Sequence, residues 1–594
     1  MNQEHRYSFT QLFVWKYSIH ALFSVSCLLW TTVLSAQTGR FSKTSPALTV
    51  LTTQATLSVK NAPKLIVVMS FDQMRGDYPN RWGHLWSQHG FNRIVRQGAY
   101  FPQCYFNHAS NITAPGHSVH LTGVYPHKSG IVSNDYFDRT AGRRLYCVQD
   151  TVNRSFGMSK PDEWCSPINL KAPTLGDYLK KISPKSRVVG ISQKDRAAIL
   201  MSGHTADAAY WFEYEAGGYT TSEYYFKELP TWLKKWNQKN SFRDYSGKIW
   251  NTVINDDLAL RDTMRWEAGG GKQRNVFPYT LPNMHTTGTI DVYSSSTFTV
   301  TPFSVEHFFK FAKSVVKEEK LGTDSIPDIL CMSVSATDYL GHTFGADSRE
   351  VQELYVHVDK QVGEWIDYLD RHIGRKHYTL VITSDHGVAP VPEYWRYANP
   401  GADAAGRLRS LDIIEELEAY LRQTFLAGAS SKWVDDWEQP SLFLNRQTLE
   451  MVTTTTIAGQ TTPTRITVLD SVQAFLLRRE GLGIVLTETQ LQANTCPAWM
   501  SQWQFNLVRN DWFPQRTGEI VMYPAKYWIW GSVTATHGTP HDYDRHSPLM
   551  FMGAGVKPGY YKDAKVAPSD IAPTLAQILG ITMANLDGVS LPCR

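Results

Sequence analysis

The 594-residue sequence is poor in cysteine, and none of its cysteines has the spacing of a thiolate metal site. Seven are present without a Cys-x-x-Cys motif, so any bound metal must be held by histidine and carboxylate side chains. Setting aside Cys27 near the N-terminus leaves an even number, which permits disulfides in an exported protein. They are Cys104, Cys147, Cys165, Cys331, Cys496 and Cys593. The nearest pair, Cys147 and Cys165, is the first candidate for a bridge.

The sequence also lacks an excess of charge of one sign. Its 59 basic and 55 acidic residues nearly cancel, which leaves no long-range field to attract nucleic acid or an anionic membrane. Any anion binding must therefore depend on local clusters of charge. Aromatic residues are plentiful, with 19 Trp, 29 Tyr and 26 Phe, and this composition favours a packed globular enzyme over a disordered chain.

A long apolar run occurs only near the N-terminus. Arg6 and Lys16 precede an apolar stretch at residues 21–34, and small residues follow it, so residues 1–36 are predicted to be a signal peptide. An uncleaved anchor is the alternative, but this run is shorter than the roughly 20 apolar residues that a spanning helix needs. Residues 37–63 are rich in Ser, Thr and Ala and are predicted to be a linker. The mature protein is expected to be periplasmic or secreted, without stable membrane insertion.

Short apolar runs, typical of buried parallel strands, recur in the rest of the chain. They lie at residues 64–70, 187–192, 329–334, 379–383 and 549–552. Helical patterns lie between them, for example at residues 351–369, where apolar residues recur every three or four positions. This alternation predicts an α/β fold with a doubly wound, mostly parallel sheet and helices on both faces. Ligands of such folds bind beyond the carboxyl ends of the strands.

Two long segments interrupt this pattern within a predicted catalytic domain spanning residues 64–594. Residues 205–325 are thick with aromatic side chains, and residues 391–535 contain a predicted helix near 411–425 together with further strands. We interpret both as insertions that could cap a cleft, although aromatic runs also occur in ordinary cores. The sequence has no internal repeat.

Polar residues that could bind metal follow several of the apolar runs. They are Asp72 in SFDQM, Asp338 and His342 in SATDYLGHTFG, Asp385 and His386 in TSDHG, and His537 in ATHGTPHDYDRH. Three aspartates and three histidines would suit a pair of zinc-class ions. Asp338 and His342 are four residues apart and would share one face of a helix. Each motif alone is weak, because a helix cap or a core histidine explains it equally well.

The stretch NITAPGHSVHLTG places Thr113 near a predicted helix start. Pro115 suits the first helical position, which would leave Thr113 at a helix N-terminus that favours an anion such as phosphate. Coordination to a metal can activate a threonine hydroxyl as a nucleophile. Two alternatives remain open: Thr113 as a simple helix cap, and Asn111-Ile112-Thr113 as a glycosylation sequon on an exposed loop.

The segment ISQKDRAAIL supplies local positive charge. If residues 193–196 are extended, Lys194 and Arg196 project the same way while Asp195 turns aside. Arg196 could bind a phosphoryl group through a bidentate hydrogen bond, and Lys194 could bind it as a point charge. A solvated charged loop is the alternative.

Taken together, these motifs resemble the alkaline phosphatase superfamily. More narrowly, they are similar to its exported bacterial alkaline phosphatases with a threonine nucleophile, which are related to type I phosphodiesterases and nucleotide pyrophosphatases. The resemblance covers most of the chain after the linker, in order and spacing, through SFDQMRGDY, NITAPGHSVHLTGVYPHKSGIVSND, VVGISQKDRAAIL, SATDYLGHTFG, TSDHG and THGTPHDYDRHSPLMFMG. It implies hydrolysis of small-molecule phosphate monoesters through a phosphothreonine intermediate at Thr113.

The resemblance also implies two zinc ions and the residues that hold them. One ion would be held by Asp72, Asp385 and His386, with Thr113 as an exchangeable ligand. The other would be held by Asp338, His342 and His537. His541 and His546 are alternatives for the last ligand, although the THG motif favours His537. Asn134 in GIVSND would donate to a nonbridging phosphate oxygen, and Lys194 and Arg196 would bind the remaining oxygens.

Other activities fit parts of the pattern. A nucleotide pyrophosphatase or phosphodiesterase would share the metals, the threonine and the asparagine, but a monoester has three free oxygens and gains more from Lys194 and Arg196. A sulfatase is disfavoured. Its nucleophile comes from a CxPxR-type motif, and the nearest match in this sequence, at residues 165–169, lacks the arginine. A phosphoglycerate mutase-like enzyme would use serine and remain in the cytoplasm. An exported binding protein that lacks catalysis is the alternative of another class.

Overall fold

The computed structural model describes residues 62–213, 217–267, 276–284, 292–402, 404–425, 431–454 and 461–594. The predicted signal peptide and all but the last two residues of the predicted linker lie outside these ranges. Within the described ranges, none of the helices has both the length and the apolar character to cross a membrane.

Among the described residues, nine strands form a central sheet in the order β19-β2-β18-β11-β1-β10-β5-β6-β7. Strands β11, β1, β10, β5 and β6 are parallel to one another, whereas β18 and β7 are antiparallel to their neighbours. The predicted mostly parallel sheet is therefore confirmed. The strands are β1 (Leu65–Phe71), β2 (Ala99–Tyr105), β5 (Val188–Ser192), β6 (Ala208–Glu213), β7 (Gly218–Thr220), β10 (Asp328–Val334), β11 (Tyr378–Thr383), β18 (His546–Gly553) and β19 (Gly559–Tyr560).

Helices cover both faces of this sheet, and β1 is therefore buried on both sides. Val67 and Met69 face a core that includes α9 (Pro302–Glu318) and α11 (Arg349–Leu369). Ile66 and Val68 face a second core that includes α5 (Leu175–Ile182) and α19 (Ile571–Leu579). A strand buried on both faces has a continuous apolar sequence instead of an alternating one, which explains why these runs could be recognised.

Strand order brings the polar motifs to one edge of the sheet. The carboxyl ends of the adjacent parallel strands β11, β1, β10 and β5 lie together, and each is followed within a few residues by one of the candidate site residues. Helix α3 (Thr113–Thr122) follows β2, which runs in the same direction as β11. It begins at Thr113 and not at Pro115, a shift of the size that is common for helix ends.

The first predicted insertion largely belongs to the core. Its strands β6 and β7 extend the central sheet, and its helices α7 (Thr231–Lys239) and α9 contribute to the main apolar core. Tyr219 stacks on Phe311 with ring centroids 3.7 Å apart, and both side chains are buried. The prediction that residues 205–325 interrupt the core is therefore wrong for these elements, because their aromatic side chains pack beneath helices.

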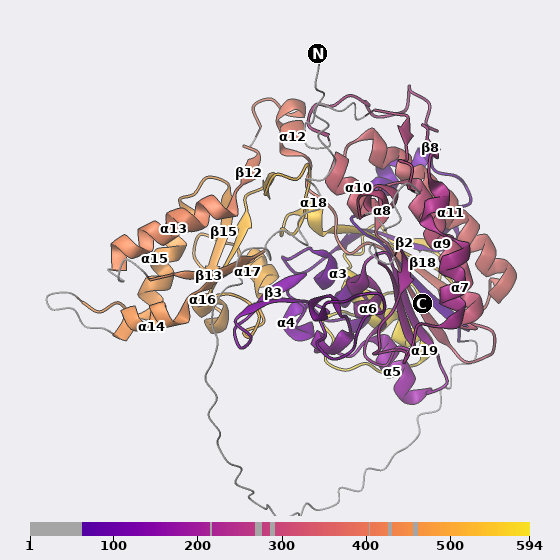
Figure 1. Cartoon of the computed structure of the whole chain (residues 1–594), viewed down its shortest axis with the longest axis horizontal. Coiled ribbons are helices and arrows are strands. Elements are labelled where there is room, and N and C mark those ends of the chain that lie inside the picture. Colours follow the sequence, from indigo (N-terminus) through magenta and orange to yellow (C-terminus); the bar gives the residue numbers. More distant parts are fainter. Residues whose placement is uncertain are drawn as a thin grey trace, which may run out of the picture. The chain divides into compact units, whose positions relative to one another are not determined.

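Residues 391–535 contain a second sheet, whose elements are orange in Figure 1. Strands β13 (Val434–Glu438), β14 (Ser441–Leu444), β16 (Ile520–Pro524) and β15 (Leu482–Thr487) are antiparallel in that order. Helices α13 (Ser410–Phe425), α14 (Arg446–Thr454) and α15 (Arg465–Leu477) share its apolar core. The hydroxyl of Ser133 donates to the carbonyl of Gln439 at 2.8 Å, so this segment contacts the loop that carries Asn134.

The sequence stretch TAPGH contains a glycine that allows α3 to approach the loop after β11. A Cβ at Gly116 would lie 2.1 Å from the backbone oxygen of Asp385. We predict that Gly116→Ala lowers the free energy of unfolding by about 1–3 kcal/mol, the usual cost of overpacking. Chemical denaturation measures this. Gly83→Ala is the control, because its Cβ would meet only Asn92 at 3.7 Å. Unchanged stability of Gly116→Ala would contradict the close approach.

Candidate metal centre

Two groups of mostly buried side chains lie at the carboxyl edge of the central sheet. In each group, three potential ligand atoms from three residues lie within 4.8 Å of one another. The first group is Asp72, Asp385 and His386, and the second is Asp338, His342 and His537. The structure thus brings together the same two sets of residues that the sequence resemblance implied.

The first group connects the ends of two neighbouring strands. Asp72 follows β1, and Asp385 and His386 follow β11. Nε2 of His386 lies 3.4 Å from Oδ1 of Asp72 and 3.3 Å from Oδ2 of Asp385. All three side chains are fully buried. A cation bound among them would therefore be shielded from water on most sides.

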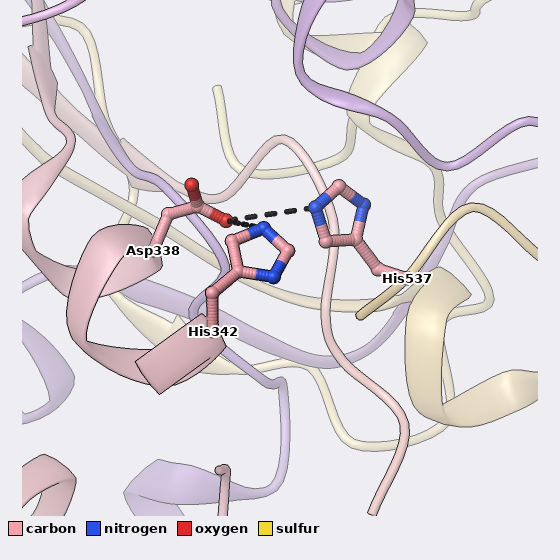
Figure 2. A group of neighbouring side chains, drawn as sticks. All are labelled: Asp338, His342 and His537. Atoms are coloured by element: carbon pink, nitrogen blue, oxygen red, sulfur yellow. Dashed lines mark ion pairs between the residues drawn. The ribbon is translucent and has the colours of Figure 1, made fainter. Parts of the chain in front are cut away.

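The second group surrounds one oxygen of Asp338, as Figure 2 shows. This atom, Oδ1, lies 3.2 Å from Nε2 of His342 and 3.5 Å from Nε2 of His537. Asp338 and His342 lie one turn apart on α10 (Ala336–Phe344), as their spacing predicted. His537 comes from the loop before α18 (Asp542–Arg545). Its ring stacks on His386 with centroids 3.5 Å apart, so the two groups adjoin.

All three histidines present Nε2 to the centre in the form that binds metal. Each Nδ1 lies 2.7 to 2.9 Å from a backbone carbonyl oxygen. The carbonyl belongs to Ala535 for His342, to Gly387 for His386 and to Asn111 for His537. A carbonyl can only accept a hydrogen bond, so Nδ1 carries a proton, and Nε2 of the neutral ring keeps the lone pair that binds a metal. Proteins commonly orient metal-binding imidazoles in this way.

The electrostatics of the first group also fit a cation. Burial, followed by the neighbouring charges of Asp338 and Asp385, raises the pKa of Asp72 well above its usual range. Burial raises the pKa of Asp385 to about 7 and lowers that of His386, which keeps the ring neutral. In the described part of the chain, Oδ1 of Asp72, Oδ2 of Asp385 and Nε2 of His386 are buried without a hydrogen bond. A divalent cation would satisfy all three atoms.

Lys194 connects the two groups. Its Nζ lies 2.7 Å from Oδ2 of Asp72, 2.5 Å from Oδ2 of Asp338 and 3.5 Å from the hydroxyl of Thr113. Because Lys194 is buried in ion pairs, it does not belong to a solvated loop. The condition that all of residues 193–196 are extended is not met: Lys194 is extended, but α6 (Asp195–Ser202) begins directly after it. An aspartate at its first position is favoured by the helix dipole.

Arg196 and Asn134 have defined partners near this centre. Arg196 Nη1 donates to the hydroxyl of Tyr146 at 3.0 Å, and that hydroxyl donates to Asp195 at 2.5 Å. Tyr146 ends β4 (Arg143–Tyr146), so a hairpin holds the guanidinium. Asn134 precedes the partner strand β3 (Asp135–Asp138), and its Oδ1 accepts from the N–H of Ala114 at 3.0 Å. Asn134 is thereby tied to the first turn of α3.

The alternatives for the Thr113 motif do not fit the structure. Thr113 is the first residue inside α3, and Ile112 occupies the cap position, so Thr113 is not the helix cap. Asn111 is fully buried, and its Nδ2 donates to the carbonyl of Thr539 at 2.8 Å. A sequon whose amide is engaged in this way cannot carry a glycan in the folded protein.

Two further predictions can be compared with the structure. Cys147 and Cys165 are not joined by a disulfide, so that prediction is wrong; the thiol of Cys165 donates to Asp195 at 3.4 Å instead. His541 and His546, the alternatives to His537, lie outside both groups. Their Nε2 atoms contact the carbonyls of Pro524 and Pro102 at 3.0 and 2.8 Å.

His117 on α3 was not predicted from the sequence as a residue of the site. Its Nδ1 lies 2.8 Å from the carbonyl of Thr113 and 3.1 Å from Oδ2 of Asp385, so it links the start of the helix to the first group. The spacing of four from Thr113 on one helix was the available clue. Gln73, next to Asp72, was also missed.

A cleft of about 690 Å³ beside Trp395 and Tyr527 includes no residue of either metal group.

Comparisons with known proteins agree with this architecture. The "Calcium-transporting ATPase" of Myroides odoratus is 31% identical over 88% of this chain and 93% of its own length. Alkaline phosphatase PhoV of Synechococcus elongatus is 30% identical over 87% of this chain and 90% of its own length. A crystal structure of the alkaline phosphatase PafA is 28% identical, covers 90% of this chain and 99% of that chain, and superposes with a TM-score of 0.79.

The fold and the two groups of ligands define an alkaline phosphatase-like α/β protein. The family profile of type I phosphodiesterases and nucleotide pyrophosphatases matches residues 66–408, more than half of the sequence. The chain belongs to this family, in agreement with the resemblance noted from its motifs.

The buried carboxyl of Asp385 makes the stability of the metal-free protein depend on pH. Its pKa is about 7 when folded and has the ordinary value of 3.8 when unfolded. Between these values the folded state binds the extra proton, so the contribution to stability is complete below about pH 4 and is lost as the pH rises through about 7. Asp385→Asn cannot lose this proton.

We therefore predict that chelator-treated wild type and Asp385→Asn unfold at similar temperatures below about pH 4, and that the variant is the more stable one above about pH 7. Addition of a divalent cation at pH 8 is expected to stabilise wild type most, because its Asp385 is then an ionised carboxylate, whereas the amide of the variant is a weaker ligand. A constant difference in unfolding temperature across this range would contradict the assignment.

Proposed function

We propose that this protein is a metal-dependent phosphate monoester hydrolase, an alkaline phosphatase, that forms a phosphothreonine intermediate at Thr113. One observation carries the proposal: the ammonium group of Lys194 contacts an aspartate of each metal group and the Thr113 hydroxyl at once. This contact supports a single site that contains the proposed nucleophile, the proposed anion-binding ammonium and both metal groups. The relatives named alkaline phosphatase support the same activity.

The residues of the two groups would hold two divalent cations, which we propose to be zinc because imidazole and carboxylate ligands suit it. Asp72, Asp385 and His386 would hold the first, with Thr113 as an exchangeable ligand. Asp338, His342 and His537 would hold the second. Bound cations of this class lower the pKa of a coordinated hydroxyl or water and neutralise charge that develops on oxygen.

Thr113 would act as the nucleophile. Its Oγ1 attacks phosphorus while the bond from phosphorus to the leaving oxygen breaks, which yields phosphothreonine and an alcohol after proton uptake. Water then attacks the same phosphorus, the Thr113 Oγ1–P bond breaks, and phosphate leaves. Because Thr113 is the first residue of α3, the positive end of the helix dipole favours the phosphoryl charge in both steps.

Asn134, Lys194 and Arg196 would bind the three free oxygens of the phosphoryl group. Since Oδ1 of Asn134 accepts from Ala114, its amide N–H groups remain as donors. Lys194 contacts Asp72 and Asp338, so cations bound to these aspartates would release its Nζ for phosphate. Arg196 is held by Tyr146, which limits the rotamers its guanidinium can adopt and lowers the entropy cost of binding.

A nucleotide pyrophosphatase or phosphodiesterase is the nearest alternative, as the family profile itself indicates. In a diester, one of the three oxygens carries a second substituent, so Lys194 and Arg196 contribute less binding energy than they do for a monoester. The terminal phosphoryl group of ATP has three free oxygens, and ATP is therefore a substrate worth testing in view of the name of the Myroides relative. We also propose that residues 1–36 direct export and that the enzyme acts in the periplasm or outside the cell.

Removal of the positively charged side chains of Lys194 and Arg196 is expected to distinguish monoesters from diesters. Each charged hydrogen bond is worth about 1.5–3 kcal/mol, so Lys194→Ala combined with Arg196→Ala should lower monoester kcat/KM by at least about 100-fold. The loss on a matched aryl phosphodiester should be far smaller. Steady-state kinetics on both substrates tests this, and equal losses would favour the phosphodiesterase alternative.

The covalent step can be tested at Thr113. We expect that acid quenching during turnover of a labelled monoester traps phosphothreonine in wild type, and that Thr113→Ala shows neither label nor hydrolysis while Thr113→Ser keeps both.

A chelator should abolish hydrolysis of a chromogenic monoester, and zinc should restore it. A zinc-loaded wild type without this activity would instead support the non-catalytic binding protein.

A further inference from the structure

Gln73 links the two metal groups. Its backbone N–H donates to Oδ1 of Asp385 at 3.1 Å, and its side-chain Nε2 donates to Oδ1 of Asp338 at 2.7 Å. The residue is 3% exposed. A single residue in the turn after β1 therefore holds one carboxylate of each group.

The backbone of Gln73 is in the left-handed region, with φ of 69°. Side chains with a Cβ rarely adopt this conformation, whereas glycine adopts it without a steric cost. A glutamine at such a position needs compensating interactions. The hydrogen bonds to Asp385 and Asp338 provide them, since the turn directs the N–H to one carboxylate and the side chain to the other.

Helix α10 leaves space for this side chain. A Cβ on Gly341 would lie 1.7 Å from Oε1 of Gln73, and its three nearest atoms all belong to Gln73. Glycine is a poor helix former, so its presence inside α10 is explained by the contact. Gly341 immediately precedes His342, which places the Gln73 amide against the turn that carries Asp338 and His342.

The hydrogen bond also fixes the oxygen on which the second group is centred. Oδ1 of Asp338 accepts from Gln73 and is the same atom that lies nearest Nε2 of His342 and His537. A carboxylate oxygen has two lone pairs, so it can accept from Gln73 and still face the histidines. Its orientation is thereby set before a cation binds.

We propose that Gln73 is a positioning residue that sets the placement of the two metal groups relative to each other by holding Asp338 and Asp385 from one strained turn. The inference rests on the proposed function only in treating the two groups as metal sites. Gln73 acts through the two aspartates and is assigned neither as a ligand nor as a contact to substrate.

Three variants separate the features of this interaction. Gln73→Gly keeps the backbone N–H and tolerates the positive φ but removes the side-chain donor. Gln73→Met keeps the approximate volume but cannot donate. Gly341→Ala removes no polar group and displaces the Gln73 amide by steric overlap alone.

Zinc binding, measured by competition with a chromophoric chelator, is the primary readout. Wild type is expected to bind two ions, and each variant should lose about 10- to 100-fold in affinity at one of them, the usual effect of removing an outer hydrogen-bond partner of a ligand. Gly341→Ala in the Gln73→Gly background should cause no further loss, because the three atoms nearest the new Cβ, out to 3.6 Å, all belong to the side chain that Gln73→Gly removes.

The outcomes distinguish this proposal from the proposed function. If wild type binds no zinc, the metal groups and the proposed function both fail. If wild type binds two ions and the Gln73 variants bind them equally well, only the role of Gln73 is overturned. Lower unfolding temperatures of the metal-free variants with unchanged zinc affinity would show a merely structural role and would also overturn it.

Discussion

The structure depends on holding three buried aspartates together at one edge of the sheet. Asp72, Asp338 and Asp385 are almost fully removed from water, and their mutual repulsion and burial oppose the charged forms. Each neighbouring polar group lowers this cost. The ammonium of Lys194 lies between Asp72 and Asp338, the N–H groups of Gln73 contact Asp338 and Asp385, and His117 contacts Asp385. Among the described residues, the atoms of the first metal group that lack a hydrogen bond, Oδ1 of Asp72, Oδ2 of Asp385 and Nε2 of His386, lie together where a cation would bind.

The topology of the sheet explains how distant residues meet. Parallel strands place equivalent ends on one edge, and the order β11-β1-β10-β5 puts the aspartate motifs and Lys194 on neighbouring strands. The proposed nucleophile, Thr113, is contributed by α3, the helix that follows β2, and His537 by a loop before β18. Because the core beneath is apolar on both faces of β1, the edge is held rigidly, as a site with sub-ångström requirements needs.

Several parts of the site follow from local patterns. Continuous apolar runs identified β1, β5, β10 and β11 because strands buried on both faces carry few polar residues. A spacing of four placed Asp338 and His342 on one helical face, and motif resemblance named the two ligand sets. Other features could not be read locally. The aromatic side chains of residues 205–325 look alike whether they line a cleft or fill a core. Lys194 is extended, but Arg196 lies in α6, which begins at Asp195.

The sequence by itself determined the α/β class, the strand positions and which residue types could bind metal and phosphate, because periodicity and motif spacing report the local environment of each residue. Only the tertiary structure decided that His117 contacts Asp385, that Cys147 and Cys165 are not bridged, and that Gln73 adopts a left-handed turn to contact both metal groups. These contacts join residues on different strands and helices. They depend on strand order and backbone direction, which no local pattern contains.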